Sequence, residues 1–171
     1  MPDYKRLVKL IARQTGTKFR AASQSDLAEL RTLRLPEPVV GFYAQHEPTE
    51  CAEGQVRLWP IADMVRENRD LIPGAYVAPL GYVVFSTTLC GDAYCFDINV
   101  VSPKDEPRIV LISHEVVGKD ITAERAQRLA KPVAGNLHEF LEKFERIELD
   151  EECVYRPVGD AEPGAAADGG A

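Results

Sequence analysis

PLGYVVFSTTLCGDAYCFD, residues 79–97, predicts two strands folded back on each other. Residues 82–85 are aromatic and β-branched, the side-chain types that fill a pleated surface. In residues 94–98 large apolar side chains alternate with smaller or polar ones, which predicts one face toward the core and one toward water. Gly91-Asp92 suits a tight turn, because glycine allows positive φ and aspartate tolerates turn geometry. The segment therefore predicts an antiparallel hairpin.

Length and charge set the broad class. The chain has 171 residues, which favours one domain with a core of its own. It holds 27 acidic residues against 20 basic ones, a formal net charge of −7. Phosphate repels such a chain, so we expect no nucleic-acid partner and favour a basic protein partner. Ordinary solubility is the alternative reason for an acidic balance.

Targeting signals and cysteines bear on the compartment. We expect neither a signal peptide nor a membrane span, because the first residues lack an apolar core and no apolar run could cross a bilayer. A cytoplasmic protein with reduced thiols is the resulting expectation. Cys90 and Cys95 flank the predicted turn, and the sequence leaves open whether they pair.

The N-terminus differs from the rest of the chain in charge. Residues 1–20 hold six basic residues, with Asp3 as their one acid. Leu7, Val8 and Ile11 share one helical face. We predict a basic N-terminal helix or arm over residues 1–21, which either packs on the domain or binds a membrane or partner.

Further elements follow from spacing and caps. Helices are predicted to begin near Ser25, Pro36, Ile61, Thr122 and Asn136. Short strands are predicted at residues 57–61 and 109–112, and polar loops at residues 46–55 and 102–107. Residues 146–171 are predicted to form an acidic, largely disordered tail.

Candidate chemical groups are few, and neither a metal nor a cofactor site is expected. His114 and Glu115 follow a predicted buried strand and give the one indication of an enzyme. The alternative is that these two polar residues only mark the point where the chain passes from the core to the solvent. Asp92 and Asp97 resemble a carboxylate pair for acid–base work, but turn chemistry and a wet strand face explain them too. Trp59, the sole tryptophan, suits either a core position or an interface anchor.

The order of these motifs resembles the SUKH superfamily, which includes a yeast cell-wall-synthesis regulator and many bacterial immunity proteins. The resemblance covers about residues 22–145. It rests on Leu35-Pro36, Leu58-Trp59-Pro60-Ile61, Leu80-Gly81, Gly91-Asp92 and the segment from Asn136 to Leu141. The chain departs from the pattern in having Cys90 where the family often has a glycine, and in a long stretch over residues 117–135.

The resemblance implies a single α+β domain, in which helices pack on a mainly antiparallel mixed sheet. It also implies a binding protein rather than an enzyme. Bacterial members neutralise toxins, often nucleases or deaminases, by direct contact. We therefore expect a basic toxin domain as partner, and the candidate contacts are Trp59, Asp92, Asp97 and Glu115.

Two other functions remain open at this level. One is a regulatory or scaffold module that binds a cellular protein. The other is a small hydrolase that uses His114 and Glu115. The partner's identity and the oligomeric state are not fixed by the sequence.

Overall fold

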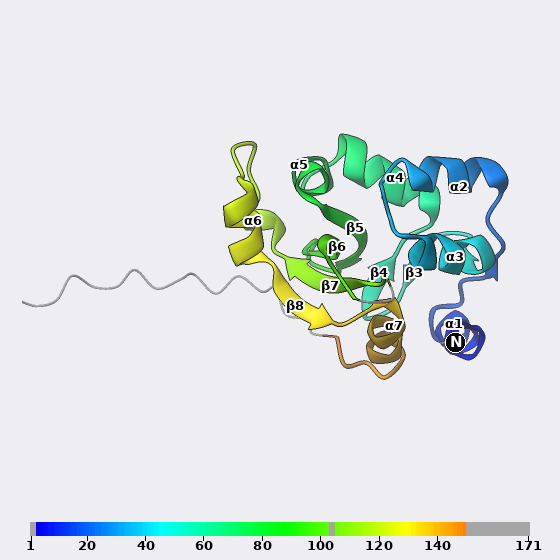
Figure 1. The fold of residues 1–171 in the computed structure, drawn as a ribbon. Coiled ribbons are helices and arrows are strands. Elements are labelled where there is room, and N and C mark those ends of the chain that lie inside the picture. Colours follow the sequence, from blue (N-terminus) through cyan, green and yellow to red (C-terminus); the bar gives the residue numbers. More distant parts are fainter. Residues whose placement is uncertain (1–2, 103–104, 150–171) are drawn as a thin grey trace, which may run out of the picture.

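The computed structural model describes residues 3–102 and 105–149 (Figure 1). One antiparallel sheet of six strands forms the centre, with its strands in chain order. These strands are Ala52–Glu53 (β3), Val56–Leu58 (β4), Tyr82–Thr88 (β5), Ala93–Val101 (β6), Pro107–Ile112 (β7) and Lys131–Ala134 (β8). Phe19–Arg20 (β1) and Glu47–Pro48 (β2) pair separately as a short ribbon.

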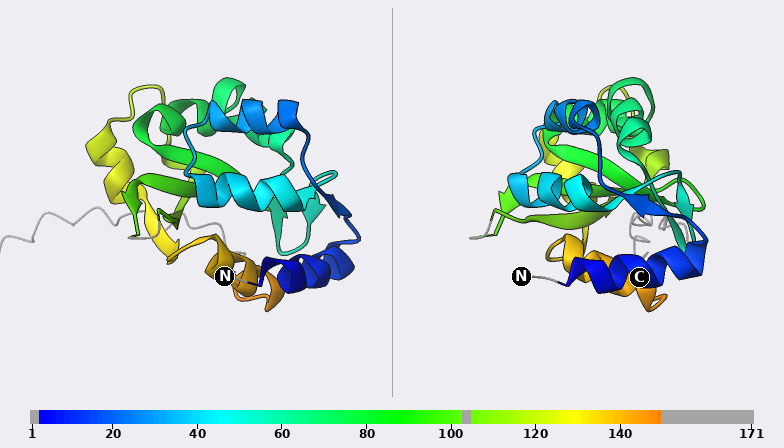
Figure 2. Two further views of the ribbon diagram at one scale, coloured as in Figure 1. Left: turned by 45° about the vertical axis from the view of Figure 1, so that its right-hand side comes forward. Right: turned by 90° about the vertical axis from the view of Figure 1, so that its right-hand side faces the viewer.

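Helices surround this sheet. The α-helices are Tyr4–Thr15 (α1), Gln24–Arg31 (α2), Glu37–His46 (α3), Ile61–Asp70 (α4), Gly74–Val77 (α5), Ala123–Leu129 (α6) and Leu137–Glu145 (α7). Ala78–Leu80 (η1) and His114–Val116 (η2) are 3-10 turns. Figures 1 and 2 show α5 and α6 toward one side of the sheet, and α1 and α7 together on the other. The predicted α+β class with helices on a mainly antiparallel sheet is confirmed.

The predicted hairpin is confirmed as β5 and β6. Its register pairs Tyr82 with Asp97 and Thr87 with Ala93. The Gly91 N–H donates to the Thr88 carbonyl at 3.1 Å, and Gly91 has a φ of 101°. The turn thus uses the positive φ that glycine allows.

The predicted wet face of the second strand is wrong. Cys95 and Asp97 are both 0% exposed. The side chains of Tyr94 and Phe96 join the larger core, while Cys95 joins a second core with Val77 of α5 and Ala126 of α6. The alternation is real, but each face of the central strands is covered, as in a layered core.

Helix α7 closes the larger core. Leu137, Phe140, Leu141 and Phe144 are buried at the predicted helical spacing. The Asn136 side chain accepts the Glu139 N–H at 2.9 Å and caps the helix as predicted. The ring of Phe140 meets those of Phe85 and Tyr94 edge-on. Helix and hairpin are therefore joined through aromatic packing.

Strands lie in two stretches where none was predicted. Residues 46–55 hold β2 and β3, and the stretch over residues 117–135 ends in β8. β8 is the last strand of the sheet and contains Pro132, which stands opposite Val110. Proline is tolerated there because an edge strand leaves one row of N–H groups unpaired. Such short strands carry too few residues to show an alternating pattern.

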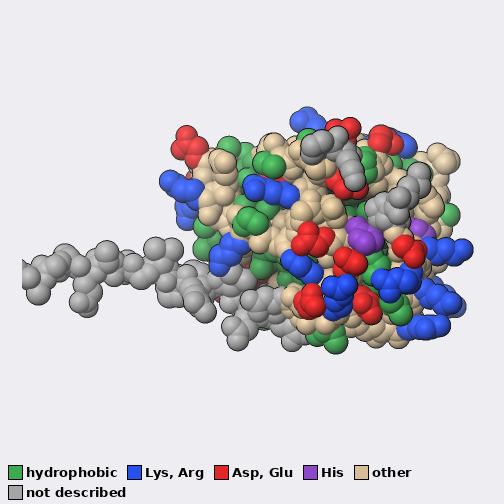
Figure 3. Space-filling view, turned by 60° about the horizontal axis from the view of Figure 1, so that its bottom comes forward, with side chains coloured by type: hydrophobic (Ala, Val, Ile, Leu, Met, Phe, Trp, Pro, Cys, Tyr) green, Lys and Arg blue, Asp and Glu red, His purple; other side chains and the backbone are tan. Residues whose placement is uncertain are grey.

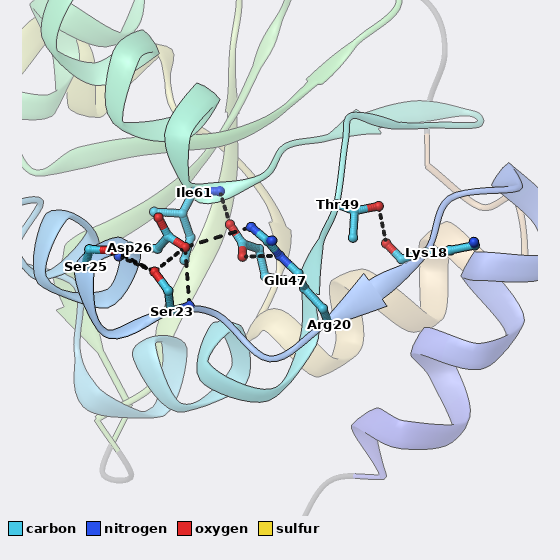
Figure 4. A network of polar contacts seen from close by, with 8 residues as sticks. All are labelled: Lys18, Arg20, Ser23, Ser25, Asp26, Glu47, Thr49 and Ile61. Carbon is cyan, nitrogen blue, oxygen red and sulfur yellow. Dashed lines mark hydrogen bonds and ion pairs between the residues drawn. The ribbon is translucent and has the colours of Figure 1, made fainter.

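A buried carboxylate ties the ribbon to the domain (Figure 4). Glu47 is 2% exposed, and its carboxylate accepts Arg20 Nε at 3.2 Å and the Ile61 N–H of α4 at 3.3 Å. Arg20 also lies 3.9 Å from Asp26, which forms a capping box with Ser23 at the start of α2. The cap is Ser23 rather than the predicted Ser25-Asp26. The network fixes the chain between α1 and α2.

Cys95 is a free, buried thiol, so Cys90 and Cys95 do not pair across the hairpin. Cys51 is free. Of the predicted tail, everything from residue 150 onward lies outside the described residues.

Candidate binding surfaces

Asp92 lies inside the molecule at the turn end of the hairpin. It is 1% exposed, and its Oδ1 accepts the His114 backbone N–H at 3.1 Å and lies 2.9 Å from His114 Nδ1. Its own N–H donates to Thr88 Oγ1 at 3.0 Å. Asp92 thus joins the hairpin turn to η2, which is a structural use of its charge.

Asp97 lies further along β6 and is equally enclosed. Its Oδ2 meets Arg108 at 2.7 Å from Nη2 and 2.8 Å from Nε, a two-point ion pair across the strands. Its Oδ1 accepts the Asn99 N–H at 3.1 Å, beside a register shift between β6 and β7. Asp97 comes five positions after Asp92, about 16 Å at the usual strand rise, so the two carboxylates do not form one site.

Glu115 is the one member of the predicted acidic set that is exposed. It lies on η2 and lines an open depression of about 510 Å³ with Arg125 and residues 116–118. His114 is not among the residues that line this depression. The histidine is instead turned to Asp92, so the two groups named for a hydrolase do not share this cavity.

Trp59 lies at the junction of β4 and α4. Its backbone N–H donates to the Phe85 carbonyl at 3.3 Å, and its half-buried side chain packs on the second core. Next to it, Pro60 forms the N-cap position of α4. Because β3 pairs with β4 so that Ala52 stands opposite Leu58, the same register places Cys51 opposite Trp59.

Three exposed acids lie within electrostatic reach of Cys51, the residue opposite Trp59. Glu53 lies opposite Arg57 and pairs with it at 3.3 Å, and Glu50 and Asp63 are exposed nearby. Burial raises the pKa of the Cys51 thiol, and the charges of Glu53, Asp63 and Glu50 raise that pKa further against the opposing charge of Arg57. The four carboxylate and guanidinium groups are therefore within electrostatic reach of one thiol. We call Trp59, Glu50, Glu53 and Asp63 the Trp59 face.

A groove between η1 and α4 was not predicted from the sequence. A cavity of about 670 Å³ is lined there by Arg34, Arg69 and Asn99, among others, and Asp97 lines an adjoining one of about 330 Å³. Arg69 is engaged by Glu29 at 2.9 Å. The Asn99 side chain lies over Gly81, whose φ is 89°. Because α4, η1, β6, α6 and the turn after α2 meet at this groove, only the tertiary structure reveals it.

Residues 3–102 and 105–149 contain no group of three or more His, Cys, Asp or Glu side chains placed to hold a metal ion. Over the same ranges, none of the helices has the length and apolar character needed to span a membrane.

Comparison with known proteins places the chain. The SMI1/KNR4 family (SUKH-1) matches residues 22–143, which run from the start of α2 to near the end of α7. The chain therefore belongs to this family, and the predicted SUKH resemblance is confirmed. Among curated proteins no match was found.

Proposed function

We propose that this chain is an immunity protein that neutralises a toxin by binding it directly. Membership of the SUKH-1 family carries the proposal, because the family includes toxin immunity proteins. The alternative is a regulatory or scaffold protein of the same family with a cellular partner. Both functions require a protein-binding surface rather than a catalytic site.

The Trp59 face is the surface proposed to meet the toxin. A half-buried tryptophan beside exposed carboxylates combines the residue type that anchors interfaces with charges that attract a basic partner. A toxin that acts on nucleic acid needs a basic cleft, to which such a face is complementary. Asp92 and Asp97 are not included, because the buried Asp92 carboxylate faces His114 and the buried Asp97 carboxylate faces Arg108. Glu115 remains a second exposed candidate on η2.

The test is rescue from a toxin domain encoded beside this gene, expressed together with the chain in a sensitive host. Rescue is expected from the natural chain. It should be lost with Glu50→Gln, Glu53→Gln and Asp63→Asn combined. Side-chain burial at these sites is low, so the fold should be kept.

The matched control removes three charges elsewhere. Glu37→Gln, Asp70→Asn and Asp120→Asn also remove three exposed negative charges, one of which is ion-paired, as Glu53 is in the test set. If both triple variants rescue equally well, the Trp59 face is not the toxin surface. If the natural chain neither binds nor rescues, and instead forms a stoichiometric complex with a cellular protein, the scaffold function replaces immunity.

A further inference from the structure

Helix α1 presents four basic side chains to solvent on a single face. Lys5, Arg6, Lys9 and Arg13 are all exposed. At the helical turn of about 100° per residue, they fall within an arc of about 100°, nearly opposite the buried side chains of the helix. Figure 3 shows Lys and Arg side chains gathered over α1, whereas acids and bases alternate over α7 beside it. We call these four residues the α1 stripe.

The helix itself is fixed to the domain. Leu7, Val8 and Ile11 are at most 7% exposed and belong to the larger core. The ring of Tyr4 packs edge-on against Phe42 and His138. The stripe is therefore a rigid row about 12 Å long from Lys5 to Arg13, not a loose arm.

The charges of the α1 stripe are arranged differently from those of α7. In α7, Lys143 pairs with Glu139 and Arg146 with Glu142, each four residues apart. In α1, Lys5, Lys9 and Arg13 are also four residues apart but carry the same sign, which destabilises a helix.

The charges of α1 are also uncompensated. Within residues 3–102 and 105–149, none of the four stripe side chains forms an ion pair with an acidic side chain. Lys5 in the first turn additionally opposes the helix dipole. The α1 stripe lowers the stability of its own helix and is basic on a chain that is otherwise acidic. Residues that reduce local stability in this way are expected at functional surfaces.

We propose that the α1 stripe is a docking surface for an acidic protein. It lies before the segment matched by the family, so this inference does not rest on the proposed immunity function. A membrane is disfavoured, because the apolar face of the helix is already buried and leaves no anchor. Nucleic acid is disfavoured, because four basic side chains on a row of about 12 Å neutralise few phosphates.

The test measures binding of the full chain to labelled poly-L-glutamate at low and physiological salt. Lys5→Gln, Lys9→Gln and Arg13→Gln combined should weaken binding about tenfold, since each exposed ionic contact contributes modestly. The control combines Arg66→Gln, Lys119→Gln and Arg128→Gln, which remove the same charge from other exposed positions, and it should bind as the natural chain does.

Lys9→Glu supplies a second, independent variant. It places an acid between Lys5 and Arg13, so the thermal midpoint should stay or rise while binding falls. This separates lost docking from lost folding. Equal losses in the stripe and control triples would overturn the proposal. So would tighter binding of a DNA duplex or of phosphatidylglycerol vesicles than of poly-L-glutamate at the stripe.

Discussion

Removing the Glu47 carboxylate should destabilise the protein far more than removing its partner Arg20. Glu47 accepts two hydrogen bonds while 2% exposed, one from Arg20 and one from the Ile61 N–H. At about 1.5 kcal/mol for a bond to a charged group, Glu47→Ala should cost about 3 kcal/mol. For a chain of this size that corresponds to a fall of about 6–12 °C in Tm.

Arg20 is expected to matter less because its side chain is 59% exposed. Water can replace an exposed guanidinium, so Arg20→Ala should cost only about 0.5–1 kcal/mol. Urea unfolding of both single variants and of the double variant gives the coupling between them. The reasoning is refuted if Arg20→Ala costs as much as Glu47→Ala, because the ion pair rather than the contact with α4 would then dominate.

Three further changes test the interior. Burial raises the pKa of the Glu67 carboxyl above its ordinary value of 4.5, so the folded state binds this proton more tightly than the unfolded state does. The contribution of Glu67 to the free energy of unfolding should therefore decline as the pH rises above about 4.5. In urea titrations from pH 4 to 7, Glu67→Gln should make that decline smaller. The Tyr43 hydroxyl is buried without a hydrogen-bond partner among the described residues, so Tyr43→Phe should leave stability unchanged or raise it by up to about 1 kcal/mol in the same assay, and a large loss would reveal a missed partner. Gly81→Ala should lower Tm more than Gly16→Ala: both glycines have positive φ, which costs about 1–2 kcal/mol for alanine, but only at Gly81 would the new methyl group also displace Asn99.

The hairpin and α7 were predictable because their signals are local. Gly91 is needed by the turn geometry, and four apolar residues at helical spacing define the buried face of α7. β2, β3 and β8 were missed because strands of two to four residues show no periodicity. Asp97 was placed on a wet face because alternation shows which residues share a face, but not whether a helix covers that face.

The sequence by itself determined the class, the family, the order of the main elements and the basic character of α1, since these depend on neighbours along the chain. Only the tertiary structure decided which charges are available to a partner. Asp92 and Asp97 are enclosed by β7, η2 and the second core, while Glu50, Glu53 and Asp63 come together beside Trp59 through the β3–β4 pairing and the start of α4. Exposure depends on packing between residues distant in sequence, and a carboxylate with an interior partner stays buried because the ion pair offsets its lost hydration.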